Sequence, residues 1–159
     1  GLTFEALKDM TYMNQVINES QRLYSGVGFL MKMCTEEFVF EGSDGLTYRI
    51  KPGTEIVVPI SGLHTDPKYW VNPDVFDPER FNDERKQTIE KMTFLPFGEG
   101  PRICVGMRMA LLQLKACLAT LLSNYKLELS PRTQVPLKMS PHYILSEPIG
   151  GNWVYISKL

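Results

Sequence analysis

Apolar residues recur at helical spacing over residues 10–24, and this pattern predicts an amphipathic helix there. Thr3, followed by Phe, Glu and Leu, is typical of the start of a short preceding helix. Ser25, Gly26 and Gly28 then end the helical pattern. The N-terminal segment is therefore predicted to be helical as far as about Tyr24.

The strongest helical pattern follows Cys104 and predicts a helix to about Asn124. Its expected apolar stripe consists of Met107, Ala110, Leu111, Leu114, Leu118, Leu121 and Leu122. Cys117 lies three residues beyond Leu114, so it is expected on this packed stripe, and Cys34 is expected in the core or in a strand.

Short strand candidates cover residues 37–40, 47–50 and 55–60, separated by glycine-rich turns, and predict a small antiparallel sheet. Two more candidates follow the long helix, at 126–129 and 153–156. The proline-rich stretch 66–101 predicts a long ordered loop, with a possible short helix near 68–70. The predicted fold class is mainly α with small antiparallel β-sheets (α+β).

Bulk properties exclude several classes of protein. The chain has 159 residues and a formal net charge of -1, so its composition predicts one domain, or a piece of one, and no nucleic-acid partner. Three widely spaced cysteines supply neither a disulfide framework nor a CxxC zinc site. No signal peptide or bilayer-spanning stretch is visible. The chain opens on Gly1 and Leu2 without an initiator methionine, and we expect it to be a fragment.

The stretch F-L-P-F-G-E-G-P-R-I-C-V-G surrounds Cys104 with residues suited to a thiolate. A helix start and the charge of Arg102 both favour thiolate over thiol, and Phe97 could cover the sulfur. The glycines would let a flat ligand approach the backbone; they are Gly98, Gly100 and Gly106. The alternative is an inert cysteine in a glycine turn, which the length of the pattern disfavours.

This stretch resembles the cysteine-ligand loop of the cytochrome P-450 superfamily, whose pattern Phe-x-x-Gly-x-Arg-x-Cys-x-Gly it matches throughout. The resemblance implies that the chain binds haem b (iron protoporphyrin IX) and that Cys104 is the axial ligand of the haem iron. It also implies that the glycines and Phe97 contact the haem and that Arg102 binds one of its propionates. It extends from Leu2 to Leu159 and is closest to insect microsomal members. Residues 1–159 would then be the C-terminal, haem-binding part of one larger P-450 domain.

Two further motifs support the resemblance. Glu19-Ser-Gln-Arg22 places an acid and a guanidinium on one helix face, and Pro78-Glu-Arg80-Phe81 lies downstream. In the family such residues form a buried triad, which implies that Glu19, Arg22 and Arg80 pin the long loop against the helix. Removing one member would leave buried charge unpaired.

Other residues take their roles from the same resemblance. Lys32 stands where the family has a propionate-binding arginine, and a solvated strand lysine remains the alternative. The implied substrate pocket consists of Val27, Gly28, Phe29, Pro141, His142 and Tyr143. His64 is expected to be a structural hydrogen-bonding residue. Arg108 and Lys115 are expected either on the proximal face that receives an acidic reductase or on a merely solvated face.

The resemblance implies a monooxygenase that inserts one atom of O₂ into a lipophilic small molecule. Its electrons would come from NADPH through a reductase, with cytochrome b5 as a further candidate partner. It also implies that the protein lies on the cytosolic face of the endoplasmic reticulum membrane. An N-terminal anchor, which is absent from these residues, would hold it there. The oxygen-activating helix motif is absent from them too, so we expect this piece alone to be inactive. A non-catalytic haem-binding or interaction fragment and an isomerase-type member of the superfamily remain alternatives.

Overall fold

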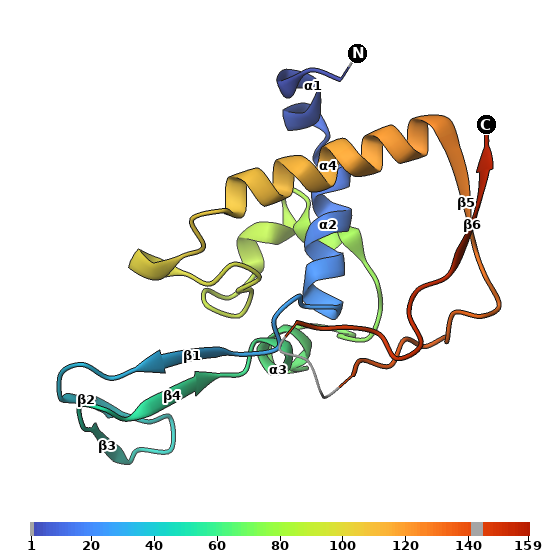
Figure 1. The fold of residues 1–159 in the computed structure, drawn as a ribbon. Helices are drawn as coiled ribbons and strands as arrows, with labels where there is room; N and C mark the ends of the chain where they lie inside the picture. The colour runs from blue at the N-terminus through green and yellow to red at the C-terminus, as the bar shows by residue number, and fades with distance from the viewer. Residues whose placement is uncertain (1, 141–144) are drawn as a thin grey trace.

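Helices and short antiparallel strand pairs make up the fold (Figure 1). The structure, a computed structural model, describes residues 2–140 and 145–159. Two helices are followed by four strands, a short helix, a long loop, a long helix and two more strands. The predicted α+β class is therefore confirmed.

The N-terminal segment forms α1 (Phe4–Asp9) and α2 (Thr11–Leu23), where the sequence pattern predicts helix. The hydroxyl oxygen of Thr3 caps α1 by accepting a hydrogen bond from the Ala6 N–H at 3.2 Å. Met10 has a ψ of 72°, outside the helical range, and so separates the two helices.

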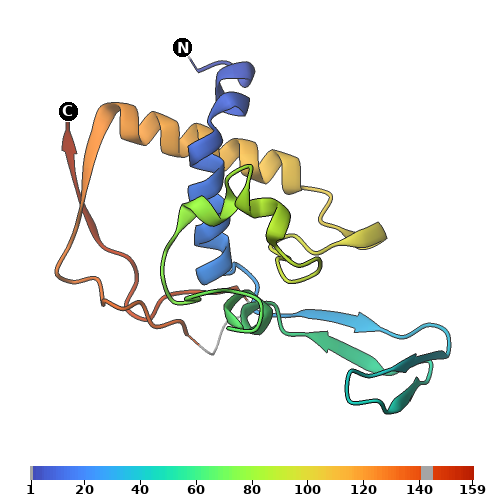
Figure 2. The same ribbon diagram turned by 180° about the vertical axis from the view of Figure 1, so that it is seen from behind.

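Within residues 2–140 and 145–159, six strands form three two-stranded antiparallel sheets. Their bounds are β1 (Leu30–Met33), β2 (Phe38–Glu41), β3 (Thr47–Ile50), β4 (Glu55–Val58), β5 (Tyr125–Leu129) and β6 (Val154–Lys158). β2 pairs with β3, β5 with β6, and β4 with β1. The sheets β1–β4 and β2–β3 extend together away from the helices (Figures 1 and 2).

The strand prediction is wrong in three respects. The candidates 37–40, 47–50 and 55–60 do not form one sheet, because β4 pairs with β1 and not with β2 or β3. β1 was not predicted, because Met and Lys have little strand preference and partners 22 to 28 positions away (Met33 with Glu55, Leu30 with Val58) give no local signal. Ile60 does not end β4 but begins α3 (Ile60–Thr65), which follows Pro59 directly.

The long loop is ordered by three 3-10 helices: η1 (Pro78–Phe81), η2 (Arg85–Thr88) and η3 (Gly100–Arg102). The short helix expected near residues 68–70 is instead a turn, in which the Trp70 N–H donates to the carbonyl of Asp66 at 3.0 Å. The loop packs against α2, and most of the small apolar core lies between them. The buried apolar side chains are Leu7, Ile17, Ile60, Trp70, Phe81, Leu95 and Ala119.

The long helix α4 (Met107–Asn124) ends where the sequence predicts and runs across the direction of α2 (Figure 1). Its buried residues are Lys115 and Ala119, whereas Leu114 on the expected stripe is 42% exposed. Cys117 is also exposed, so its predicted core position is wrong. The reason is that α1 contacts α4 at Lys115, which lies off the expected apolar stripe.

Candidate functional site

A buried network of charge joins α2 to the long loop. Arg22 Nε lies 2.8 Å from one carboxylate oxygen of Glu19, and Arg80 Nε lies 3.3 Å from the other. Glu19 and Arg22 are fully buried, and Arg80 is 6% exposed. The structure thus brings together all three residues of the expected triad, across 61 positions of the chain.

One carboxylate cannot balance two guanidinium groups, and backbone carbonyls supply the other acceptors. Arg22 donates to the carbonyl of Pro73 at 2.6 Å and Arg80 to that of Asn72 at 2.8 Å. Asn72 has a φ of 50°, a left-handed conformation that Asn tolerates better than most residues. The loop backbone therefore forms part of the charge network.

His64 links this network to the stretch before Cys104. Its carbonyl accepts from Arg22 Nη1 at 2.8 Å, and its ring Nε2 accepts from the Leu95 N–H at 2.7 Å. Burial lowers the pKa of His64 to about 4, so the ring is neutral and Nε2 can accept. The expected structural hydrogen-bonding role of His64 is confirmed.

An aromatic cluster packs around His64. The Phe94 ring lies 5.2 Å from the imidazole and 4.7 Å from the Phe81 ring, between centroids. Trp70 packs edge-on against Phe94, and the Arg22 guanidinium carbon lies 5.2 Å from the Trp70 ring centroid. The sequence reasoning did not single out Trp70 or Phe94, although a buried ring beside a charge network is common where loops pack on helices.

The cysteine loop closes on itself through backbone hydrogen bonds. The Cys104 N–H donates to the Phe97 carbonyl at 2.9 Å, which makes 97–104 a closed turn. Gly98 and Gly100 have φ values of 74° and 78°, where a side chain would be strained. Gly106 has ordinary helical angles, but a Cβ there would lie 3.9 Å from Cys104 Sγ. Backbone conformation thus explains two of the glycines, whereas a Cβ at Gly106 would make only an ordinary van der Waals contact with the sulfur.

Cys104 lies at a cavity of about 360 Å³. The described lining is Gln21, Gly26, Val27, Leu30, Ile60, Pro96, Phe97, Gly98, Cys104 and Leu145. Of the expected pocket residues, Val27 lines this cavity, whereas Gly28 and Phe29 are not among its lining residues. Pro141, His142 and Tyr143 lie outside the described residues.

Neither of the two candidate propionate residues is among the described residues that line the cavity. Arg102 is exposed at the end of η3, two residues before Cys104. Lys32 is exposed on β1, two residues beyond the cavity residue Leu30 and hence on the same strand face.

The basic face expected on α4 needs a correction. Arg108 is exposed, but Lys115 is buried, and its ammonium donates to the Leu7 carbonyl in α1 at 2.7 Å. Because it binds near the C-terminal end of α1, it complements the negative end of that helix. Lys115 therefore joins two helices and is not part of a reductase-facing surface.

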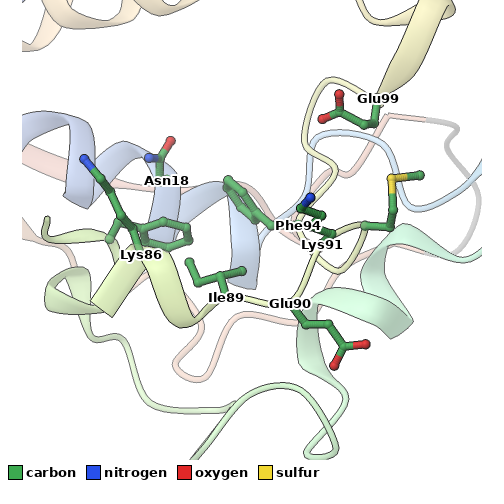
Figure 3. A pocket seen from close by; sticks show the side chains of 9 residues that line it. Asn18, Lys86, Ile89, Glu90, Lys91, Phe94 and Glu99 are labelled. Atoms are coloured by element: carbon green, nitrogen blue, oxygen red, sulfur yellow. The ribbon is translucent and has the colours of Figure 1, made fainter. Parts of the chain in front are cut away.

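A larger cavity, of about 670 Å³, lies between α2 and the long loop. Figure 3 shows Lys86 at one end of it and Glu90 and Glu99 at the other, with Phe94 and Ile89 between them. Its charges have mixed sign and it does not include Cys104, so the smaller cavity is the better candidate site.

The family model described as Cytochrome P450 matches residues 1–154, and the chain belongs to that family. It is 38% identical to Cytochrome P450 6a2 of Drosophila melanogaster over 99% of the chain and 31% of that protein. It is 39% identical to Cytochrome P450 9e2 of Blattella germanica, over 96% of the chain and 28% of that protein.

Similarity extends to a mammalian protein, Cytochrome P450 3A17 of Cavia porcellus, with 38% identity over 90% of the chain and 27% of that protein. The chain thus spans about three tenths of the length of these relatives. Within the described residues, no helix combines the length and apolarity needed to cross a membrane.

Membership of this family implies a haem cofactor, and the Cys104 cavity fits such a group in its chemistry. It combines one thiol with a mainly apolar lining, as a largely apolar macrocycle with a thiolate-ligated metal needs. Gly98 and Phe97 line it beside Cys104, so backbone and ring surface are both available to a flat group.

Proposed function

We propose that this chain is the cysteine-ligand part of a haem-thiolate monooxygenase, forming residues 1–159 of one larger P-450 domain. The observation that carries the proposal is a single thiol, Cys104, in an apolar cavity at a closed glycine-rich turn. Phe97, Gly98, Gly100 and Gly106 would lie against haem b, and Arg102 and Lys32 would bind its propionates.

The residues of this chain would hold and tune the haem. Cys104 precedes α4 by three residues and would bind the haem iron as its thiolate ligand. The network of Glu19, Arg22 and Arg80 would keep the long loop, and with it the cysteine turn, in place on α2. The haem would supply the oxygen chemistry, which no side chain can.

The complete protein would insert one atom of O₂ into a lipophilic small molecule. Val27 and, by resemblance, Gly28, Phe29, Pro141, His142 and Tyr143 would contribute to the substrate pocket. Electrons would come from NADPH through a reductase, with cytochrome b5 as a further candidate partner. The endoplasmic reticulum membrane, on its cytosolic face, is the proposed location.

The test is the carbon monoxide adduct of the reduced full-length protein. We expect a thiolate-shifted Soret band in the wild type and its loss in Cys104→Ala, because the alanine cannot ligate iron. Cys34→Ala and Cys117→Ala are matched controls and should keep the band. Survival of the shifted band in Cys104→Ala would exclude Cys104 as the ligand.

A further inference from the structure

Gln21 combines a buried, unpartnered side-chain oxygen with a place among the residues that line the Cys104 cavity. Its side-chain oxygen Oε1 is buried and has no hydrogen-bond partner, and the residue lines the cavity together with Cys104 and Phe97. Its neighbour Arg22, by contrast, has several partners. Gln21 is thus one of two α2 residues with a buried, unpartnered side-chain oxygen, and of the two it is the one that lines the Cys104 cavity.

The surroundings make this amide unusual. Apart from Gln21 and Cys104, the described residues of the lining offer only apolar side chains or glycine. A buried polar group without a partner costs about 1–3 kcal/mol, so a leucine would suit the unloaded cavity better. A buried amide at such a place costs the least free energy if the ligand itself brings a hydrogen-bond partner for it.

Binding of haem would create such a partner. A half-turn of the amide exchanges its oxygen and nitrogen ends, so Gln21 can donate as well as accept. Haem brings ionised propionates, and ligation converts the Cys104 thiol to a thiolate. Both are anionic acceptors, and hydrogen bonds to charged groups are stronger than those between neutral ones.

We propose that Gln21 is a haem-contact residue whose carboxamide N–H donates to an anionic acceptor of the haem-thiolate unit. The inference rests on the proposed function and assigns to this site a polar contact beyond Arg102 and Lys32. The acceptor is either a propionate carboxylate or the Cys104 thiolate, and the experiment separates the two.

The experiment compares full-length wild type with Gln21→Leu, and with Gln15→Leu as the matched control. Gln15 lies on the same helix and also has a buried, unpartnered Oε1, but it is not among the residues lining the Cys104 cavity. Both variants should make the haem-free protein more stable, because each removes an orphaned oxygen. Only Gln21→Leu should speed the transfer of haem to apomyoglobin, by about tenfold or more.

Two further readouts identify the acceptor. If it is the thiolate, Gln21→Leu should lower the reduction potential and raise the iron–sulfur stretching frequency, because the sulfur then donates more charge. If it is a propionate, the stretch should not move, and haem dimethyl ester should dissociate equally fast from wild type and variant. Gln21→Met replaces Gln21→Leu if the latter does not fold.

The outcomes separate this inference from the proposed function. Wild type without a thiolate-ligated haem would overturn the proposed function. If the wild type binds that haem, but Gln21→Leu and Gln15→Leu both release it at the wild-type rate, only the role of Gln21 is overturned. A bound water would then be the hydrogen-bond partner of Gln21.

Discussion

At the residue scale, Glu19 is the one carboxylate that the described structure places against two buried guanidinium groups. It also accepts a hydrogen bond from the Asp77 N–H at 2.9 Å, so its oxygens are fully used. Buried ion pairs contribute little net stability, because desolvation offsets their attraction, but losing one partner is costly. The network therefore determines the position of the loop more than it increases the free energy of unfolding.

Arg22→Met should lower the free energy of unfolding by about 3–5 kcal/mol, since it leaves Glu19 with Arg80 alone and unpairs carbonyls of the loop. Urea unfolding of the full-length protein measures this. Arg49→Met is the control, because the Arg49–Glu37 pair is largely exposed, and it should change stability by less than about 1 kcal/mol. Equal effects of the two variants would contradict the assigned role of the network.

Part of this site could be predicted from single residues and part could not. The Glu-x-x-Arg and Pro-Glu-Arg-Phe motifs named the three charged residues, because their side chains define a recognisable pattern. The carbonyls of Asn72 and Pro73 have no such signature, since every residue has one. The orphaned Gln21 oxygen depends on what surrounds it, which only the fold defines.

At the element scale, α3 is held to the cysteine loop by one hydrogen bond, from the Leu95 N–H to His64 Nε2. Protonation would turn this acceptor into a donor and place a second cation beside Arg22. The folded-state pKa of about 4 lies below the ordinary value of 6.5, so the unfolded chain binds the proton more readily. Stability is therefore lost as the pH falls from about 6.5 towards 4.

We expect the free energy of unfolding to decrease over this window by up to about 1.4 kcal/mol per pH unit through His64. Urea unfolding between pH 7 and pH 4 measures it, with His64→Gln as the variant that cannot titrate. At pH 7 the variant should be the less stable protein, and the difference in the free energy of unfolding between the two proteins should decrease towards pH 4. A gap that stays constant would show that His64 does not carry this dependence.

Elements were predicted best where local spacing decides them. α2 and α4 follow from 3.6-residue periodicity, and both end close to the predicted residues. The buried face of α4 was misjudged because Lys115 binds a carbonyl of α1, and no pattern within α4 contains that information. β1 was missed for the same reason, because its strand character depends on β4.

At the scale of the whole molecule, few apolar side chains are buried and many large ones are exposed. Met109, Leu114 and Leu122 are exposed on α4, and Met31 and Val57 on the β1–β4 sheet. A folded chain of this length ordinarily buries about two thirds of its surface, and large apolar patches mark interaction surfaces. Since the chain spans about three tenths of its relatives' length, we infer that further chain of the same protein covers these faces.

The isolated 159-residue chain should accordingly behave as an incomplete fold, because the apolar side chains on α4 and on the β1–β4 sheet would face water. We expect it to bind a hydrophobic dye such as ANS, to self-associate in size-exclusion chromatography with light scattering, and to unfold in urea with low cooperativity. The full-length protein, as the control, should bind little dye and unfold cooperatively. A monomeric 159-residue chain with a sharp transition and no dye binding would show instead that α2, the long loop and their buried charge network suffice to stabilise the fold without the covering chain.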